Sequence, residues 1–249
     1  MSNVLQMPAA ESRDCKHHGP YEARYFPSLV GGGSGHWYSE CPQCVEARER
    51  ERQECEHNLE VMGLLQKADI PPRFQGKGFS AFKPRTPKQS AALKVCRKYV
   101  NDLNENFKAG TCLVLLGPVG VGKSHLLSAI LQEAVAALCR VRYTTAADFL
   151  ATISGNWAWH GQDAGKPYVR VPLLALDEIG MPEGGRDREA LFALIDARYR
   201  ECRPTLLASN MKWQDMRESL GHRLYDRLRE NGGQVVALDG ESYRGQGAT

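Results

Sequence analysis

The residues best suited to chemistry in this chain form an uninterrupted phosphate-binding pattern, G-x-x-x-x-G-K-[ST], over residues 117–124. Its members are Gly117, Pro118, Val119, Gly120, Val121, Gly122, Lys123 and Ser124. Glycines let backbone N–H groups turn toward a phosphate, the lysine reaches the β- and γ-phosphates, and the serine hydroxyl binds Mg²⁺. The pattern follows an apolar run and opens a helical one, as a phosphate cradle requires. We therefore predict a nucleoside triphosphate site with Mg²⁺, rather than a glycine-rich turn with a surface lysine.

A second group of polar side chains follows the apolar run 173–176. Asp177 and Glu178 end this run, at the position where parallel sheets bind their ligands. We expect Asp177 to hold Mg²⁺ together with Ser124, and Glu178 to orient the attacking water. Asn210 ends the next apolar run and is expected near the γ-phosphate, although a turn-capping asparagine gives the same pattern.

Two arginines downstream share one face of an expected helix, because Arg223 and Arg227 are four residues apart. An arginine supplied by a neighbouring subunit stabilises transition-state charge in many phosphoryl-transfer enzymes. The alternative interpretation is a solvated basic helix.

The N-terminal segment offers a metal-binding set of cysteines and histidines. Cys41 and Cys44 have the C-x-x-C spacing of a zinc knuckle, and Cys15 with His18 forms a matching C-x-x-H pair. Three thiolates and one imidazole make a closed tetrahedral set, which suits structural Zn²⁺. His17 is the alternative to His18, and reduced cysteines without a metal are the alternative to the site. Weaker candidates nearby are Cys55 and His57.

The elements that position the phosphate-binding residues alternate in type from residue 111 onward. Strands are predicted within residues 111–117, 139–145, 169–180, 203–210 and 234–240, and most of these segments are apolar runs. Helical patterns fill the intervals, at 124–138, 146–154, 188–202 and 213–230. Wholly apolar strands that alternate with helices are typical of a parallel sheet with helices on both faces. The predicted fold class is therefore α/β, with a parallel-sheet P-loop domain.

The net charge of +3 conceals an uneven distribution along the chain. Residues 1–70 carry a net charge of −4, residues 71–110 carry +7, and residues 111–249 are neutral. Positive charge together with aromatic rings is the combination that binds single-stranded DNA, and the first part of this basic segment, residues 71–90, holds three phenylalanines. A linker whose phenylalanines pack on the next domain is an equally supported interpretation. The residues concerned are Arg73, Phe74, Lys77, Phe79, Phe82, Lys83, Arg85, Lys88, Lys94, Arg97 and Lys98.

Two tryptophans, Trp157 and Trp159, form a second candidate DNA contact, since exposed rings of this size are uncommon without a ligand. No apolar run approaches the ~18 residues that a membrane span needs. The first residues lack the basic and apolar regions of a secretory signal. We expect a cytoplasmic protein with no membrane partner.

Over about residues 68–244 the chain resembles the AAA+ ATPases of the DnaC/IstB group. The matching segments are IPPRF at 70–74, GPVGVGKSHL at 117–126, LLALDEIG at 173–180, LLASNM at 206–211, and GHRLYDRLRE and ESYR near the end. Within the group the chain is most similar to DnaC-type replicative helicase loaders of phage or prophage type. Some of these also begin with C-x-x-H-G and C-P-x-C segments.

The resemblance implies a set of roles for the matching residues. ATP with Mg²⁺ would bind at residues 117–125, which include His125, and Lys123, Asp177, Glu178 and Asn210 would serve hydrolysis. Arg227, with Arg223 next, would be the arginine supplied in trans. Arg244 matches a family feature at this end of the chain, and no helical lid domain follows Arg229. The implied partners are a hexameric replicative helicase, single-stranded DNA and further copies of the chain.

These expectations divide the chain into four parts. Residues 1–14 would be a disordered tail, and residues 15–68 a zinc-binding, helicase-docking module that ends in a helix over 45–68. Residues 69–110 would be a basic linker and the first helix of the ATPase region, capped by Thr86 and Pro87 and closed by Gly110. Residues 111–249 would be the AAA+ core. A module as short as 15–68 needs the metal as its staple.

Two alternative functions share the same motifs. An IstB-type ATPase that assists a DNA transposase has the same motor. A nucleotide-dependent adaptor that does not hydrolyse ATP is the other, and the presence of Lys123, Asp177 and Glu178 argues against it.

Overall fold

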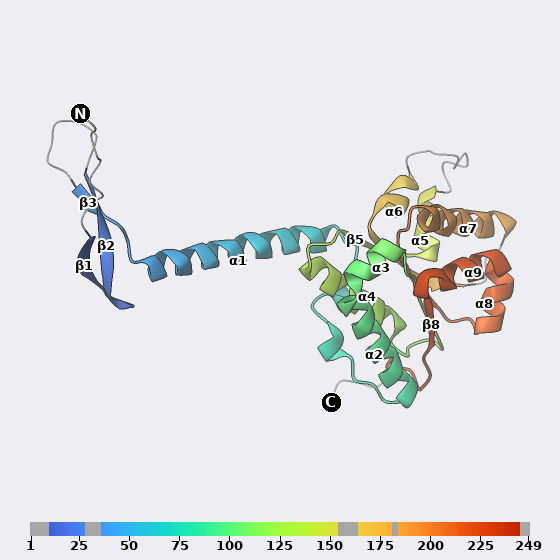
Figure 1. Ribbon diagram of the computed structural model, residues 1–249. Helices are drawn as coiled ribbons and strands as arrows, with labels where there is room; N and C mark the ends of the chain where they lie inside the picture. Colours follow the sequence, from blue (N-terminus) through green and yellow to red (C-terminus); the bar gives the residue numbers. More distant parts are fainter. Residues whose placement is uncertain (1–9, 28–35, 154–163, 181–183, 245–249) are drawn as a thin grey trace. The chain divides into compact units, whose positions relative to one another are not determined.

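The computed structural model describes residues 10–27, 36–153, 164–180 and 184–244 (Figure 1). The chain divides into two compact units, residues 1–60 and 61–249. Trp157 and Trp159, the second candidate DNA contact, lie outside the described residues.

The first unit holds an antiparallel sheet and the greater part of a long helix. Strands β1 (Ala10–Cys15), β2 (Gly19–Pro27) and β3 (His36–Tyr38) pair in the order β1-β2-β3, and α1 (Pro42–Gln66) follows directly after Cys41. Residues 10–14, expected in a disordered tail, instead form most of β1 and pair with β2. Their charged side chains give no apolar alternation, so only the long-range pairing reveals this strand.

The second unit begins within α1, at residue 61, rather than at the expected residue 69. Val61, Leu64 and Leu65 pack against its core, and Ala68 and Ile70 are buried in it. The turn after α1 is attached to the central sheet, because Ala68 O accepts a hydrogen bond of 2.7 Å from Tyr143 N. Next to it, Asp69 pairs with Arg142 at 2.9 Å.

A parallel five-stranded sheet forms the centre of the second unit, which confirms the predicted fold class. Its strands lie in the order β5-β6-β7-β4-β8. They are β4 (Leu113–Leu116), β5 (Val141–Thr145), β6 (Leu173–Ile179), β7 (Thr205–Ser209) and β8 (Gln234–Ala237). The first strand of the unit, β4, lies between β7 and β8, so the carboxyl ends of β4, β6 and β7 meet at one edge.

Helices cover both faces of this sheet. Alternate apolar residues of the strands face α2 (Pro87–Asn101) and α4 (Lys123–Ala136) on one side. On the other side they face α5 (Ala146–Ile153), α6 (Lys166–Arg170), α7 (Gly185–Arg200), α8 (Trp213–Leu220) and α9 (His222–Arg229). The last three helices group together in Figure 1. The short α3 (Leu103–Ala109) follows α2 and ends at Gly110 in the left-handed conformation, as predicted. None of the helices in the described part of the chain is long and apolar enough to cross a membrane.

The basic segment before α2 is folded onto the second unit. Phe79 and Phe82 are buried, at 7% and 4% exposure, and Phe74 packs against the same core. The Gln132 side chain of α4 fixes the segment, because it donates to Phe74 O and accepts from Gly76 N. The three-residue helices η1 (Pro72–Phe74) and η2 (Phe79–Ala81) lie in this stretch. The structure therefore supports the packing interpretation for the phenylalanines, leaving the basic side chains exposed.

One buried arginine holds together the far side of the sheet. Arg198 of α7 is fully buried and donates through Nη1 and Nη2 to backbone carbonyls at the end of α6 and before β6 and β7. Its Nε also donates to Thr205 Oγ1 at 2.9 Å. Burial lowers the pKa of Arg198 to about 9. The donors of the guanidinium are thus matched to backbone carbonyl oxygens and to the Thr205 hydroxyl.

Candidate nucleotide and metal sites

The phosphate-binding loop connects β4 to α4, as the sequence predicts. Three of its glycines have no room for a side chain. A Cβ on Gly117 (φ 149°) would lie 2.3 Å from Leu238 O, one on Gly120 (φ 81°) 1.9 Å from Ser242 Oγ, and one on Gly122 (φ 98°) 2.4 Å from the Phe82 ring. The loop is therefore enclosed by the segment after β8 on one side and by the basic segment on the other, with its backbone free to follow a phosphate.

Lys123 lies at the centre of the loop and is only 6% exposed. Its Nζ donates hydrogen bonds of 2.7 Å each to Gly117 O, Pro118 O and Asn210 Oδ1. Burial lowers its pKa to about 8, and the nearby Asp177 opposes this shift. The structure thus brings Lys123 and Asn210 together, and within the described residues no carboxylate bonds to the amine, so the ammonium group can turn to an entering phosphate.

Asp177 and Glu178 lie on a bulge in β6. The register with β7 shifts between Leu176 and Ile179, which adds one residue to β6. Glu178 takes a left-handed conformation with φ 54°, while Asp177 stays 2% exposed and its Oδ1 accepts from Glu178 N at 2.7 Å. A strained conformation of this kind costs about 1–3 kcal/mol and is found where it serves a site. The bulge leaves the Glu178 side chain exposed toward the cleft.

A residue that the sequence did not indicate, Tyr143 of β5, contacts one of the two expected Mg²⁺ ligands and lies close to the other. Its hydroxyl donates a hydrogen bond to Asp177 Oδ2. Burial raises the pKa of Tyr143, the negative charge of Asp177 raises it further, and the nearby Ser124 side chain lowers it. A hydroxyl and a carboxylate are donors that suit Mg²⁺, so the pair Ser124 and Asp177 fits this ion.

A cleft of about 630 Å³ opens beside the loop. Lys123, Ser124, Asp177, Glu178 and Asn210 line it together, as predicted. Further lining residues missed from the sequence come from distant segments: Phe74, Phe82, Lys83, Arg85 and Tyr243. His125, expected to bind nucleotide, and Arg244, of unassigned role, also line the cleft.

The ESYR segment encloses the cleft by binding to both the loop and the basic segment. Tyr243 N donates to Gly120 O at 2.9 Å, and Tyr243 Oη donates to Lys83 O and Gln89 Oε1. The Arg85 guanidinium stacks on the Tyr243 ring at 4.3 Å. Such contacts link residues about 120 to 160 positions apart, so no local pattern could have predicted them.

The two candidate arginines of α9 have different surroundings. Arg227 forms an ion pair with Asp196 of α7, and its guanidinium lies 5.0 Å from the centre of the Tyr199 ring. Arg223 is exposed, and among the described residues no interaction of its side chain is found. Arg227, the arginine placed first on sequence grounds, is therefore the one already paired within its own chain.

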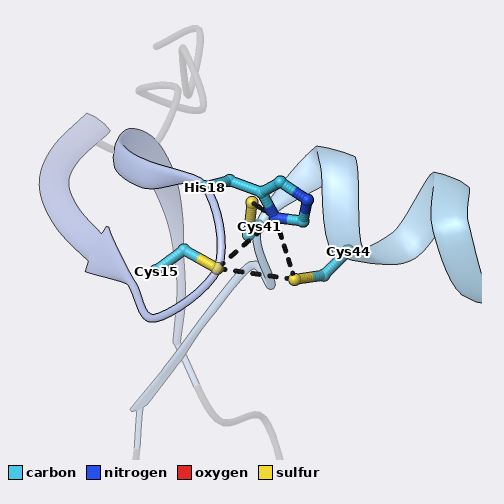
Figure 2. A group of neighbouring side chains, drawn as sticks. All are labelled: Cys15, His18, Cys41 and Cys44. Atoms are coloured by element: carbon cyan, nitrogen blue, oxygen red, sulfur yellow. Dashed lines mark hydrogen bonds between the residues drawn. The ribbon is translucent and has the colours of Figure 1, made fainter.

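The first unit brings together the four predicted metal ligands (Figure 2). Cys15 Sγ, His18 Nδ1, Cys41 Sγ and Cys44 Sγ all lie within 4.8 Å of one another. The closest pairs are Cys44 with His18 at 3.3 Å and Cys15 with Cys44 at 3.4 Å. Tetrahedral Zn²⁺ with bonds of ~2.0–2.3 Å places its donors about 3.3–3.8 Å apart, so the set fits this ion. His17, Cys55 and His57 are not among these ligands.

The thiols of this cluster differ in acidity. The backbone N–H of His17, followed by the side chain of His18, lowers the pKa of Cys15 to about 6. The hydrogen bond to Cys15 raises the pKa of Cys44 to about 11. Ionisation of one thiol is thus favoured, and ionisation of a second thiol beside it is opposed. A divalent cation at the centre would reduce the repulsion between the two thiolates.

Residues 85–248 match the family model described as IstB-like ATP binding protein. The chain belongs to this family. The match covers α2 and the whole sheet of the second unit, and it does not extend to the cysteine–histidine cluster. Members of the family bind ATP through this loop and sheet.

Two relatives from Escherichia coli K12 are similar over most of their length. The uncharacterised protein YdaV is 28% identical over 207 residues, which cover 81% of this chain and 79% of YdaV. The replicative helicase loader DnaC is 26% identical over 190 residues, which cover 75% of this chain and 76% of DnaC.

Solved structures show the same fold. The DnaC helicase loader gives a TM-score of 0.60 at 22% identity and covers 68% of this chain and 99% of that structure. DnaI gives 0.60 at 21% identity, over 71% of this chain and 95% of its own. The second unit is thus an AAA+ P-loop domain like those of DnaC and DnaI.

Proposed function

We propose that this protein loads a replicative DNA helicase onto single-stranded DNA and hydrolyses ATP as it does so. The observation that carries the proposal is the cleft in which Lys123, Ser124, Asp177 and Glu178 converge, in a chain whose relatives include DnaC. Binding requires the loop and the lysine, whereas hydrolysis requires a group that can position water, and Glu178 is such a group.

The residues of the cleft divide this work. The loop amides and Lys123 would bind the phosphates, and Ser124 with Asp177 would hold Mg²⁺, which supplies charge neutralisation at the phosphates when it is bound. Glu178, exposed on its bulge, would orient the water, and Asn210 would hold the γ-phosphate side. Phe82, His125 and Tyr243 surround the remaining, aromatic part of the cleft, where a base can lie.

Self-association would complete the site. Arg223 is the arginine that we now place first for the role in trans, because it is exposed, whereas Arg227 would have to leave Asp196. Mixing an Arg223→Ala variant with a Glu178→Gln variant tests this idea. If hydrolysis sites form between copies, active sites that combine an intact Glu178 with an intact Arg223 should restore part of the lost activity.

The first unit would bind the helicase through its zinc-stapled sheet, with Zn²⁺ held by Cys15, His18, Cys41 and Cys44. Residues 1–70 are acidic, with a net charge of −4, which disfavours a primary contact with DNA. The exposed basic side chains of the 71–110 segment are the better candidates for contact with single-stranded DNA.

The family description also supports a second function. The DnaC/IstB resemblance described above includes IstB-type ATPases, which serve transposition. This protein would then assist a DNA transposase. The motor is common to both functions, so the partner distinguishes them.

Co-purification of the full chain with hexameric replicative helicases, with and without ATP, tests the proposal directly. We expect a complex whose stability depends on the nucleotide, and loss of the complex in a Cys41→Ser, Cys44→Ser double variant. Stimulation of a transposase without any helicase complex would favour the second function. Absence of ATP hydrolysis in the presence of DNA and helicase would contradict the enzymatic role.

A further inference from the structure

We propose that Tyr143 is a positioning residue that sets the affinity of the nucleotide site for Mg²⁺. This inference rests on the proposed function, since it assigns the role of a residue toward the ion that Ser124 and Asp177 would hold. The structure gives three independent observations for it: the hydrogen bond of the hydroxyl to Asp177, the burial of Tyr143, and its placement on a different element from either ligand.

The hydrogen bond has a definite direction. The Tyr143 hydroxyl donates its proton to Asp177 Oδ2, and its oxygen keeps lone pairs that can accept a proton. A serine hydroxyl that turns its lone pairs to a cation must direct its proton elsewhere, and Ser124 lies close to Tyr143. The carboxylate ligand is therefore oriented directly by the tyrosine hydroxyl, which also offers the neighbouring serine an acceptor.

The orientation of the Asp177 carboxylate is fixed from two sides. Oδ1 accepts from Glu178 N at 2.7 Å, while Oδ2 accepts from Tyr143. Each oxygen keeps a further lone pair, so two acceptor positions remain for the ion or its water. Loss of the tyrosine hydroxyl would free one oxygen and allow the carboxylate to rotate away.

Burial makes the hydroxyl costly to leave without a partner. Tyr143 is 5% exposed and Asp177 is 2% exposed. Tyr143 belongs to β5, whereas Asp177 is on β6 and Ser124 begins α4, and Tyr143 N is bonded to Ala68 O. Tyr143 is thus a firmly held hydrogen-bond partner of an expected metal ligand. Substitution of such partners typically lowers metal affinity by about 10–100-fold.

The experiment is a Mg²⁺ titration of the full chain in the presence of a fluorescent, non-hydrolysable ATP analogue, for the wild type and for Tyr143→Phe. We expect the half-saturating Mg²⁺ concentration to rise by about 10-fold or more, with binding of the analogue in EDTA unchanged. Tyr99→Phe is the matched control, because Tyr99 is also buried and donates to Thr111 O at 2.8 Å, far from the cleft. It should leave the Mg²⁺ dependence as in the wild type.

The possible outcomes separate this inference from the proposed function. An unchanged Mg²⁺ dependence in Tyr143→Phe, alongside a clear shift in Asp177→Asn, would overturn the role of Tyr143 and leave the proposed function standing. A wild-type protein whose nucleotide binding does not respond to Mg²⁺ would overturn both. If Tyr143→Phe does not fold, Tyr143→Leu also removes the hydroxyl donor, and its half-saturating Mg²⁺ concentration should lie above that of the wild type. Equality with the wild type would again contradict the inference.

Discussion

The two units of the molecule differ in what is available to stabilise them. In the described part of residues 1–60, the only buried apolar side chains are Ala23 and Cys41, and the structure converges on four metal-ligand atoms. The second unit instead places two apolar clusters on the faces of a parallel sheet, and its functional residues lie at one edge of that sheet. A few donor atoms at the right spacing can thus replace a core, whereas a catalytic cleft needs a core to hold segments that are distant in sequence.

Removal of the metal should give the largest effect. It tests directly whether the first unit depends on a metal and the second unit does not. Zinc-dependent modules gain an apparent ~10–16 kcal/mol from their ion at neutral pH. Treatment with a strong zinc chelator should therefore unfold β1–β3, which limited proteolysis would detect as cleavage within residues 10–60. Nucleotide binding by the second unit should survive the same treatment. A first unit that resists proteolysis after complete removal of Zn²⁺ would show that it does not depend on the staple.

Glu178→Gln tests whether the cleft of the second unit hydrolyses ATP. The glutamine keeps the size of the side chain and removes the charge, so ATP binding should be retained while kcat falls by about 10²–10⁴-fold. Lys123→Ala should instead reduce nucleotide binding itself, because it removes the group that faces the phosphates. Steady-state hydrolysis and equilibrium binding of a nucleotide analogue measure the two effects. Hydrolysis that is unaffected by Glu178→Gln would show that the activity does not arise at this site, which would then act as the nucleotide-binding site of an adaptor.

Arg198→Met tests how far the second unit depends on one polar group within its core. The substitution leaves several buried carbonyl oxygens without a donor, and we expect the free energy of unfolding to fall by about 3 kcal/mol. Urea denaturation of the second unit, followed by tryptophan fluorescence or circular dichroism, measures this change.

The control for Arg198 is Arg200→Ala on the same helix. Arg200 is exposed and pairs with Asp196 at 3.2 Å, so its removal should change stability by less than about 1 kcal/mol. Equal effects of the two variants would mean that the buried carbonyls find other partners.

The smallest effect concerns the contact between α2 and the segment after β8. The hydrogen bond from Thr86, and then that from Lys88, lowers the pKa of Asp239. Since the folded pKa is depressed, the stabilisation is present above the unfolded pKa of ~3.9 and is lost as the pH falls through the lower folded value. Asp239→Asn should therefore lower Tm slightly at neutral pH and not at pH 2–3. A difference that persists at the acidic pH would assign the effect to something other than the charge.

The sequence predictions that the structure reproduces depend on patterns of residues close together in the chain. The Thr86–Pro87 cap is observed, with Thr86 Oγ1 accepting from Gln89 N at 3.1 Å, because capping involves only neighbouring residues. Asp177 and Asn210 could be placed at one edge because parallel strands end together. Cys15, His18, Cys41 and Cys44 were identified by spacing alone, although their roles toward a metal stay a prediction.

Long-range contacts explain what the sequence did not reveal. Tyr143 reads as an ordinary member of an apolar strand, and only the pairing of β5 with β6 brings it to Asp177. Tyr243 and Phe82 reach the cleft through contacts across the whole second unit. The bulge at Glu178 is equally invisible, because it is defined by the register with β7 and not by residue type.

The attachment of the turn after α1 has a consequence for the cleft. The same residue of β5 that bonds to Ala68 through its backbone bonds to Asp177 through its side chain. Asp69 and Arg142 reinforce this attachment one residue away. The turn after α1 and the acidic edge of the cleft are therefore separated by a single residue, Tyr143, which is the shortest covalent and hydrogen-bonded path between them in this part of the structure.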